Sequence, residues 1–332
     1  MLRTWTGKGY IEMNRRDFIK SAFAGGALIA TAKLPSVAKD DPALFPERGG
    51  YERLSISFAT VRAGAQKPFA ALHISDTHLC EAYDDEGEIE VKLRDMRRKT
   101  FGGHQETALA ESIAWAKKNV DWIIHTGDLI DFQSRANFDL VKKHFGEAMS
   151  GALGNHEYAR HMWLAAEKEP KTEEWKNRTR ARLGEVFPFD VVLHSQIVNG
   201  VNFVTLDDVY GTVTETQVER FRAEAAKGLP IVLCMHVPFF TDDIWRATTQ
   251  FWARSGSRFS DASVPPRKGD YQRQSEDAVT RGFIAYLKRE PLLKAILAGH
   301  EHVTMQDRFS ETAVEYIVGG NFLFAAREVF FI

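Results

Sequence analysis

Short apolar runs alternate with amphipathic stretches along most of the chain after residue 50. Runs rich in β-branched and aromatic residues predict strands, whereas apolar residues at helical spacing predict helices. Strands are expected at residues 54–61, 69–74, 120–125, 151–153, 191–198, 201–206, 230–235, 295–298, 313–318 and 322–331. Helices are expected at residues 105–118, 136–149, 213–227 and 276–288.

The order of these elements predicts the fold class. Strand and helix alternate through most of the chain, and several strands follow one another near its end, which is typical of a layered α/β sandwich. Asn199-Gly200, between two apolar runs, is a strong signal for a hairpin. Because the sequence shows no internal repeat and no clear linker, residues 39–332 are expected to form a single domain.

The first 38 residues have a different pattern. Arg15-Arg16-Asp17-Phe18 precedes a short run of small apolar residues at 21–32, and Ser36-Val37-Ala38 suits a signal-peptidase site. The arginine pair resembles a twin-arginine export signal, and residues 1–12 are an extension before it. A plain amphipathic helix is the alternative. We expect the twin-arginine export machinery to be a partner and the mature protein to be periplasmic or secreted.

Composition narrows the classes of function. The chain has 332 residues, of which 44% are hydrophobic, and a formal net charge of −2. This charge does not favour a stable nucleic-acid or membrane partner, so phosphate recognition would need a local site. Cys80 and Cys234 are the only cysteines. They could pair in an oxidising compartment, although two buried thiols are the simpler interpretation.

Five short motifs carry the candidate chemistry, and four of them stand at the end of an apolar run. In a layered α/β fold the carboxyl ends of strands gather in one crevice, so these side chains should converge there. If strand geometry continues, Asp76 and His78 point to the same side, as do His300 and His302. A glycine in three of the motifs would allow a tight turn. The motifs are Asp76-Thr77-His78, Gly127-Asp128-Leu129-Ile130-Asp131, Gly154-Asn155-His156-Glu157, His236 and Gly299-His300-Glu301-His302.

Carboxylate, amide and imidazole groups in this mixture suit Mn, Fe or Zn better than Ca or a cysteine-rich structural zinc site. Seven ligands are too many for one ordinary ion. Two divalent ions that share a bridging carboxylate fit the count. The candidate ligands are Asp76, His78, Asp128, Asn155, His236, His300 and His302.

From about Phe69 to the C-terminus, the five motifs in this order resemble those of the calcineurin-like metallophosphoesterases. The resemblance implies a four-layer α/β/β/α sandwich with a dinuclear metal site at one end of its sheets. It implies that Asp128 bridges the ions, that His156 faces the leaving group and that Asp131 orients His156. Helix capping is the alternative for Asp131. The implied ligands are Asp76, His78 and His302 for the first metal, and Asn155, His236 and His300 for the second.

The activity implied is hydrolysis of small-molecule phosphate mono- or diesters by a metal-bridging hydroxide, with protonated His156 as the acid. A catalytically inactive protein that binds phosphate ligands is the alternative, but both Asp128 and His156 are present. Phe132 stands where protein phosphatases have an arginine, and no tyrosine follows Asp128, as it does in purple acid phosphatases. These departures indicate a general bacterial secreted esterase. The chain also lacks the compact histidine cluster of metallo-β-lactamases.

Two less regular segments, 81–104 and 241–274, directly follow candidate ligands and are expected to surround the site as loops or a small cap. His104 could contact the substrate, although a structural role is the simpler interpretation. The aromatic and arginine residues of 245–259 could stack on a nucleobase, although packing and solvated charge are the simpler interpretation. A structural role is expected for His73, His125 and His194, and a position in a surface turn for Asp207 and Asp208.

Overall fold

The computed structural model describes residues 2–5, 10–13, 53–145, 149–165, 169–254 and 268–332. It divides into two compact units, Met1–Glu52 and Arg53–Ile332. In the first, β1 (Leu2–Trp5) pairs antiparallel with β2 (Tyr10–Met13). The predicted export signal and residues 39–52 lie outside the described residues, so both the signal and the domain boundary remain predictions.

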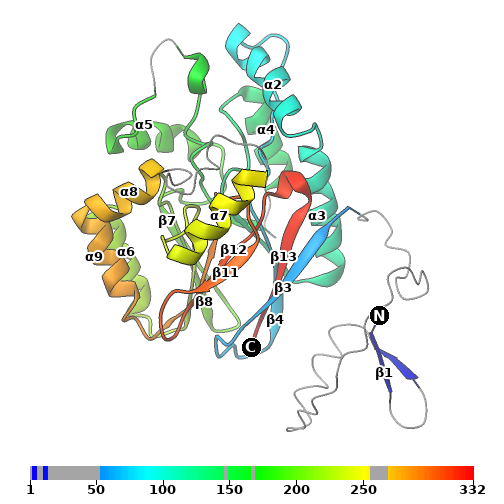
Figure 1. Ribbon diagram of the computed structural model, residues 1–332, viewed down its shortest axis with the longest axis vertical. Coiled ribbons are helices and arrows are strands. Elements are labelled where there is room, and N and C mark those ends of the chain that lie inside the picture. The colour runs from blue at the N-terminus through cyan, green and yellow to red at the C-terminus, as the bar shows by residue number, and fades with distance from the viewer. Residues whose placement is uncertain (1, 6–9, 14–52, 146–148, 166–168, 255–267) are drawn as a thin grey trace. The chain divides into compact units, whose positions relative to one another are not determined.

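The first of two central sheets in the second unit has the strand order β3-β13-β4-β5-β6 (Figure 1). Strands β4, β5 and β6 run parallel, so their carboxyl ends lie at the same edge. Strand β13 is antiparallel to β4 and parallel to β3. The bounds are Ser55–Val61 for β3, Phe69–Ile74 for β4, Trp122–Thr126 for β5, Met149–Ala152 for β6 and Ala325–Phe331 for β13.

The second sheet has the order β11-β12-β10-β9-β8-β7, and its four inner strands, β12, β10, β9 and β8, run parallel. Asn199 and Gly200, with φ of 48° and 82°, form the predicted hairpin between β7 and β8. The bounds are Leu193–Val198 for β7, Val201–Leu206 for β8, Ile231–Cys234 for β9, Leu293–Ala298 for β10, Met305–Arg308 for β11 and Val314–Ile317 for β12.

The two sheets pack face to face through a buried apolar layer. Phe203 of the second sheet lies 6.0 Å from Phe69 and 4.8 Å from Trp122 of the first, measured between ring centroids. Burial of one such side chain stabilises a fold by about 1.5–3 kcal/mol. This layer therefore holds the two sheets against each other.

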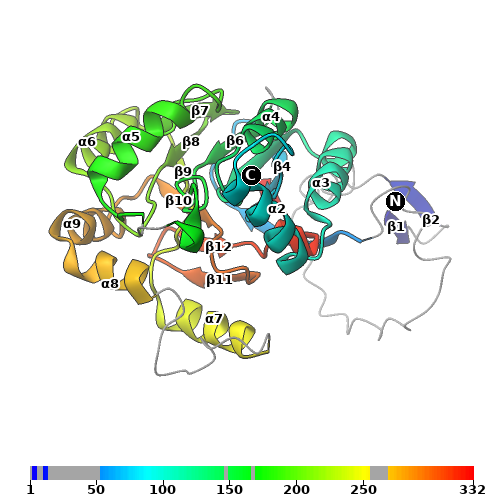
Figure 2. The same cartoon turned by 90° about the horizontal axis from the view of Figure 1, so that it is seen from above.

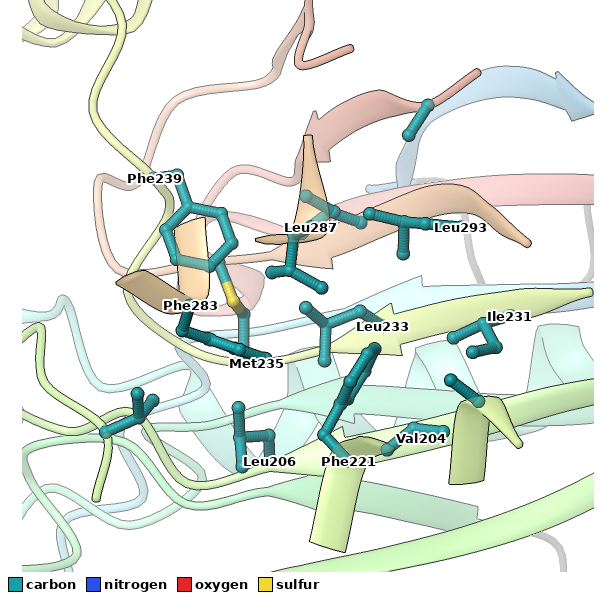
Figure 3. Close-up of a cluster of buried hydrophobic side chains, with 14 of the residues drawn as sticks. Val204, Leu206, Phe221, Ile231, Leu233, Met235, Phe239, Phe283, Leu287 and Leu293 are labelled. Atoms are coloured by element: carbon teal, nitrogen blue, oxygen red, sulfur yellow. The ribbon is translucent and has the colours of Figure 1, made fainter. Parts of the chain in front are cut away.

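Helices cover the outer faces. Helix α3 (Gln105–Asn119) packs on β4 and β5, whereas α6 (Glu215–Ala225) packs on β7 and β8. Figure 3 shows Phe221 of α6, with Phe283 and Leu287 of α9 (Ala278–Leu287), packed against side chains of the second sheet. In Figure 2, α3 and α4 (Arg135–His144) lie on one side of the sheets and α6 and α9 on the other. The α/β/β/α sandwich is confirmed.

Several sequence-based boundaries were wrong. The helix expected at 136–149 ends at His144, and Met149 already belongs to β6. The strand expected at 322–331 begins with the 3-10 helix η4 (Asn321–Leu323). Helix α5 (Glu173–Leu183), the 3-10 helix η2 (Met162–Leu164) and strand β11 were not predicted.

In their described residues, the two segments expected as loops or a small cap are largely helical. Segment 81–104 contains α2 (Glu88–Thr100), and segment 241–274 contains α7 (Asp242–Arg254) and α8 (Lys268–Glu276). Helix α2 buries Leu93, and Ile89 and Met96 pack partly buried against the same apolar cluster. Its acidic first turn and basic last turn suit the helix dipole, which explains the order of charge along that segment.

The two cysteines are free, buried thiols, so the disulfide alternative is wrong and the simpler interpretation is confirmed. Burial raises the pKa of both, that of Cys234 to about 12. Within the described ranges, no helix combines the length and apolar character that a membrane span requires.

Candidate metal centre

The candidate ligands leave parallel strands of both sheets at the same end. Six of the seven are buried, and Asn155 is half-buried. In chain order they are Asp76 and His78 after β4, Asp128 after β5, Asn155 after β6, His236 after β9, and His300 and His302 after β10.

A first group consists of Asp76, His78 and His302. The Nε2 atom of His302 lies 3.2 Å from Nε2 of His78 and 3.2 Å from Oδ1 of Asp76. The Nε2 atom of His78 lies 3.8 Å from that same oxygen. One carboxylate and two imidazoles therefore direct one atom each at a common point.

A second group consists of Asn155, His236 and His300. The Nε2 atom of His236 lies 3.1 Å from Nδ1 of His300 and 3.3 Å from Oδ1 of Asn155. Asp128 lies between the two groups. Its Oδ2 is 3.3 Å from Nε2 of His236 and 3.8 Å from Nε2 of His78, so one oxygen faces both groups.

These donors fit divalent cations. No group in the described part of the chain donates a hydrogen bond to Oδ1 of Asp76 or Oδ2 of Asp128, although both atoms are buried. A buried carboxylate oxygen without a partner is costly unless a cation compensates it. Ligands about 2.0–2.1 Å from one ion lie about 3–3.4 Å apart, which is close to the separations between these atoms. The set contains no thiolate and mixes oxygen with imidazole nitrogen, which suits Mn, Fe or Zn.

Hydrogen bonds on the far side of three histidine rings select the nitrogen that faces the groups. Nδ1 of His78 lies 2.9 Å from Oδ1 of Asp131, and Nδ1 of His236 lies 2.7 Å from the carbonyl oxygen of Thr126. Nε2 of His300 lies 3.0 Å from a carboxylate oxygen of α8. Metal-binding histidines commonly donate their second ring N–H to such acceptors.

The backbone at the ligands is strained. Five ligand residues have φ between 52° and 70°, a left-handed conformation that costs a non-glycine residue about 1–2 kcal/mol. Strand geometry therefore does not continue through them as the sequence suggested, although their side chains still converge. Such strain is typical of functional sites. The five residues are Asp76, His78, Asp128, His300 and His302.

Buried carboxylates hold these strained loops through backbone N–H groups. Glu157 accepts hydrogen bonds from the N–H groups of Asp128, Ile130 and Gly154 at 2.9, 3.0 and 2.6 Å. Asp76 likewise accepts from His300 at 2.9 Å. The loops are thus tied to one another by contacts that do not use the metal-facing atoms.

The motif glycines act in two ways. Gly127, with φ of 96°, makes the expected tight turn. Gly154 does not have positive φ, but a Cβ there would lie 2.1 Å from Oδ1 of Asp128. Glycine is therefore needed at position 154 for space beside Asp128.

His156 stands beside the ligands, and its side chain is 12% exposed. Its Nδ1 lies 3.0 Å from Oδ1 of Asp131, and its backbone N–H donates to Asp128 at 2.8 Å. Burial lowers the pKa of His156, but the carboxylates of Asp128 and Asp131 raise it above its ordinary value overall. The side chain of Ser134 caps α4, so the helix-capping alternative for Asp131 is wrong.

Helix α2 supplies a residue that sequence reasoning left without a role. Arg97 donates to Asp131 from Nε at 2.5 Å and from Nη2 at 2.8 Å. Its guanidinium also lies 4.6 Å from the Phe101 ring, which stacks on His78 at 4.4 Å. The basic last turn of α2 was visible in the sequence, but its partner was not.

Asp207 and Asp208 are buried, so the prediction that they lie in a surface turn was wrong. Asp207 bonds to Arg180 of α5 and to the hydroxyl of Tyr158, whereas Asp208 accepts the backbone N–H of His236 at 3.0 Å. Both follow β8 at the end of the sheet that carries the ligands. That position was the signal that could have assigned them to the site.

The four other histidines singled out in the sequence have different surroundings. His73 and His125 bond to the threonine hydroxyls of Thr126 and Thr77 in the interior, in line with a structural role, as does His194 with Ser150. His104 is exposed beside Phe324, and no contact with a ligand is seen in the described part of the chain.

The aromatic stretch does reach the site. Trp252 of α7 lies 5.5 Å from the ring of His302, whereas residues 255–259 lie outside the described residues.

A family model described as calcineurin-like phosphoesterase matches residues 69–304. No curated protein matches the chain by sequence. Among solved structures, a dimetal phosphatase from Danio rerio is 13% identical, with a TM-score of 0.44 over 77% of this chain and 89% of that one.

A 5′-nucleotidase from Candida albicans is 12% identical, with a TM-score of 0.37 over 81% of this chain and 47% of that one. An NAD nucleotidase from Haemophilus influenzae is 12% identical, with a TM-score of 0.36 over 76% of this chain and 45% of that one. The chain spans about half the length of each nucleotidase.

Proposed function

The chain belongs to the calcineurin-like phosphoesterase family and is a metal-dependent phosphoester hydrolase, and we propose that it uses two divalent ions to hydrolyse small-molecule phosphate mono- or diesters outside the cytoplasm. In this proposal Asp128 would help to hold both ions. Asp76, His78 and His302 would hold the first ion, and Asn155, His236 and His300 the second.

The observation that carries the proposal is the position of Oδ2 of Asp128. It is buried, accepts no hydrogen bond from a described residue and faces a histidine nitrogen of each group at 3.3 and 3.8 Å. When bound, the ions would supply positive charge beside the phosphoryl oxygens and make a shared water acidic enough to attack as hydroxide.

The protein's own contribution beyond the ligands is a proton donor. His156 is partly exposed beside the bridging carboxylate, and Asp131 and Asp128 favour its protonated form. With Nδ1 held by Asp131, the opposite ring nitrogen, Nε2, is available to protonate a departing alkoxide. Arg97 and His78 keep Asp131 in place from two other directions.

The location outside the cytoplasm rests on sequence. Arg15, Arg16 and Phe18, before a short apolar run, support export by the twin-arginine route. That route carries folded proteins, so metal would enter the site before export.

The deciding experiment compares Asp128→Asn with wild type after metal removal and reconstitution with Mn or Zn. Turnover should be measured with nucleotides, sugar phosphates and bis-p-nitrophenyl phosphate. The variant loses the charge between two dications, so both metal content and turnover should fall by orders of magnitude. Asp84→Asn is the matched control, because the Asp84 side chain is 93% exposed. Two full equivalents of metal and near-wild-type turnover in Asp128→Asn would contradict the two-metal proposal.

A further inference from the structure

A carboxylate on α8 contacts the second ligand group on the side away from the other ligands. Oδ2 of Asp270 lies 3.0 Å from Nε2 of His300, and both side chains are buried. The opposite ring nitrogen, Nδ1, lies 3.1 Å from Nε2 of His236 inside that group. His300 thus connects Asp270 to the point where the second ion would bind. None of the five motifs includes Asp270.

We propose that Asp270 is a positioning residue for the second metal ion, acting through His300. This inference rests on the proposed function, because it takes His300 as a ligand. A neutral imidazole has one N–H donor and one lone pair. When Nε2–H donates to Asp270, the lone pair is on Nδ1 and points at the metal position, so the acceptor selects both the tautomer and the ring orientation.

Asp270 is the nearer of two carboxylates at this nitrogen. Oε1 of Glu301 lies 3.7 Å from Nε2 of His300, beyond hydrogen-bonding distance, whereas Oδ2 of Asp270 lies at 3.0 Å. The ammonium group of Lys171 lies 3.6 Å from the other oxygen of Asp270, within ion-pair distance. Lys171, Asp270 and His300 therefore form a series of polar contacts that ends at the second ligand group.

Residues next to Asp270 on α8 pack against the core and the neighbouring loops. Tyr271 is buried against Ala298, at the end of the strand that precedes His300. Gln274 bonds to the backbone on both sides of Phe239, at the N–H of Phe240 and the carbonyl oxygen of Pro238. These contacts fix α8 to the end of β10, just before His300, and to the loop after β9 that carries His236. In Figure 1, α8 lies beside α9 at the end of the second sheet.

In the first group, a carboxylate from a different segment orients a histidine. Nδ1 of His78 is held by Asp131, which α2 supports through Arg97. No described contact joins Asp270 to Asp131. A change at Asp270 should therefore act mainly on the second ion.

The test is a titration of metal-stripped protein with Mn²⁺, followed by calorimetry and by electron paramagnetic resonance, which distinguishes a spin-coupled pair from single ions. Wild type should bind two ions. In Asp270→Asn the binding constant of the first ion should change little, and that of the second should weaken about 10–100-fold. Single-ion spectra should then persist to higher Mn²⁺ concentrations. Asp270→Glu keeps a carboxylate and should recover part of the loss.

Glu276→Gln is the matched control, since it removes one negative charge from the exposed part of the same helix and should change neither constant. Thermal unfolding of the stripped proteins checks that Asp270→Asn folds. An unchanged second constant in Asp270→Asn, or an equal loss at both ions, would overturn the inference. If wild type binds two ions with this pattern but hydrolyses no phosphate ester, the proposed function fails and the role of Asp270 stands. If wild type binds a single ion, both fail.

Discussion

Replacement of Arg97 by methionine tests whether α2 is part of the metal centre. The variant loses two charge-assisted hydrogen bonds to Asp131, of 2.5 and 2.8 Å, and the contact with the Phe101 ring. Methionine keeps much of the apolar stem. What remains is a fully buried carboxylate whose other described partners are histidines.

The expected cost follows from this burial. Removing one partner of a buried ion pair costs about 3–5 kcal/mol. Since His78 and His156 still donate to Asp131, and Arg97 itself is 11% exposed, we expect a smaller cost, about 2–3 kcal/mol. In a domain of this size that corresponds to a fall of about 5–10 °C in the unfolding temperature.

The pH dependence has a definite sign. Burial raises the pKa of Asp131, but His156 and Arg97 together hold it well below its ordinary value. A carboxylate with a depressed folded pKa contributes stability that is complete above its unfolded pKa, about 3.9, and is lost as the pH falls through the folded pKa. The difference between the variant and wild type should therefore persist at neutral pH and shrink only below about pH 4.

The assay is thermal unfolding of the stripped proteins, together with turnover of an alkyl and a p-nitrophenyl phosphate. Because Asp131 also holds His156, the alkyl ester should lose more activity than the aryl ester. Arg98→Met is the control, since Arg98 is 50% exposed and pairs with Glu81, a surface contact worth about 1 kcal/mol at most. If the unfolding temperature of Arg97→Met were no lower than that of Arg98→Met, the hydrogen bonds from Arg97 to Asp131 would not stabilise the fold.

Three other changes give sharp outcomes. His156→Ala should reduce hydrolysis of alkyl phosphates about 10²–10⁴-fold and that of p-nitrophenyl phosphate much less, whereas equal losses would exclude the proton-donor role. Metal-free His302→Gly should be more stable than His302→Ala by about 0.5–1 kcal/mol in chemical unfolding, because alanine at φ 56° is strained; the reverse order would refute that account. Arg15→Lys with Arg16→Lys should keep the folded enzyme in the cytoplasm, as fractionation would show, and an unchanged exported yield would argue against the twin-arginine signal.

The sequence by itself determined the class of fold and the set of candidate ligands. Alternating apolar runs and amphipathic stretches reflect burial within a few residues, so they predicted the sandwich and the hairpin at Asn199. Ligand chemistry is equally local. Asp76, Asp128 and His236 could be singled out because a carboxylate or imidazole directly follows a strand, and the structure brings these side chains together.

Tertiary structure alone decided what surrounds the ligands. Arg97 and Asp270 contact partners that are 34 and 30 positions away in the sequence, so no local pattern pointed to their roles. Asp208 looked like a turn residue because its partner, the backbone N–H of His236, is 28 positions away. The left-handed backbone at Asp76 and His300 is likewise held by hydrogen bonds between loops. A sequence pattern records which side chains are buried nearby, whereas these partners depend on which strand ends the fold brings together.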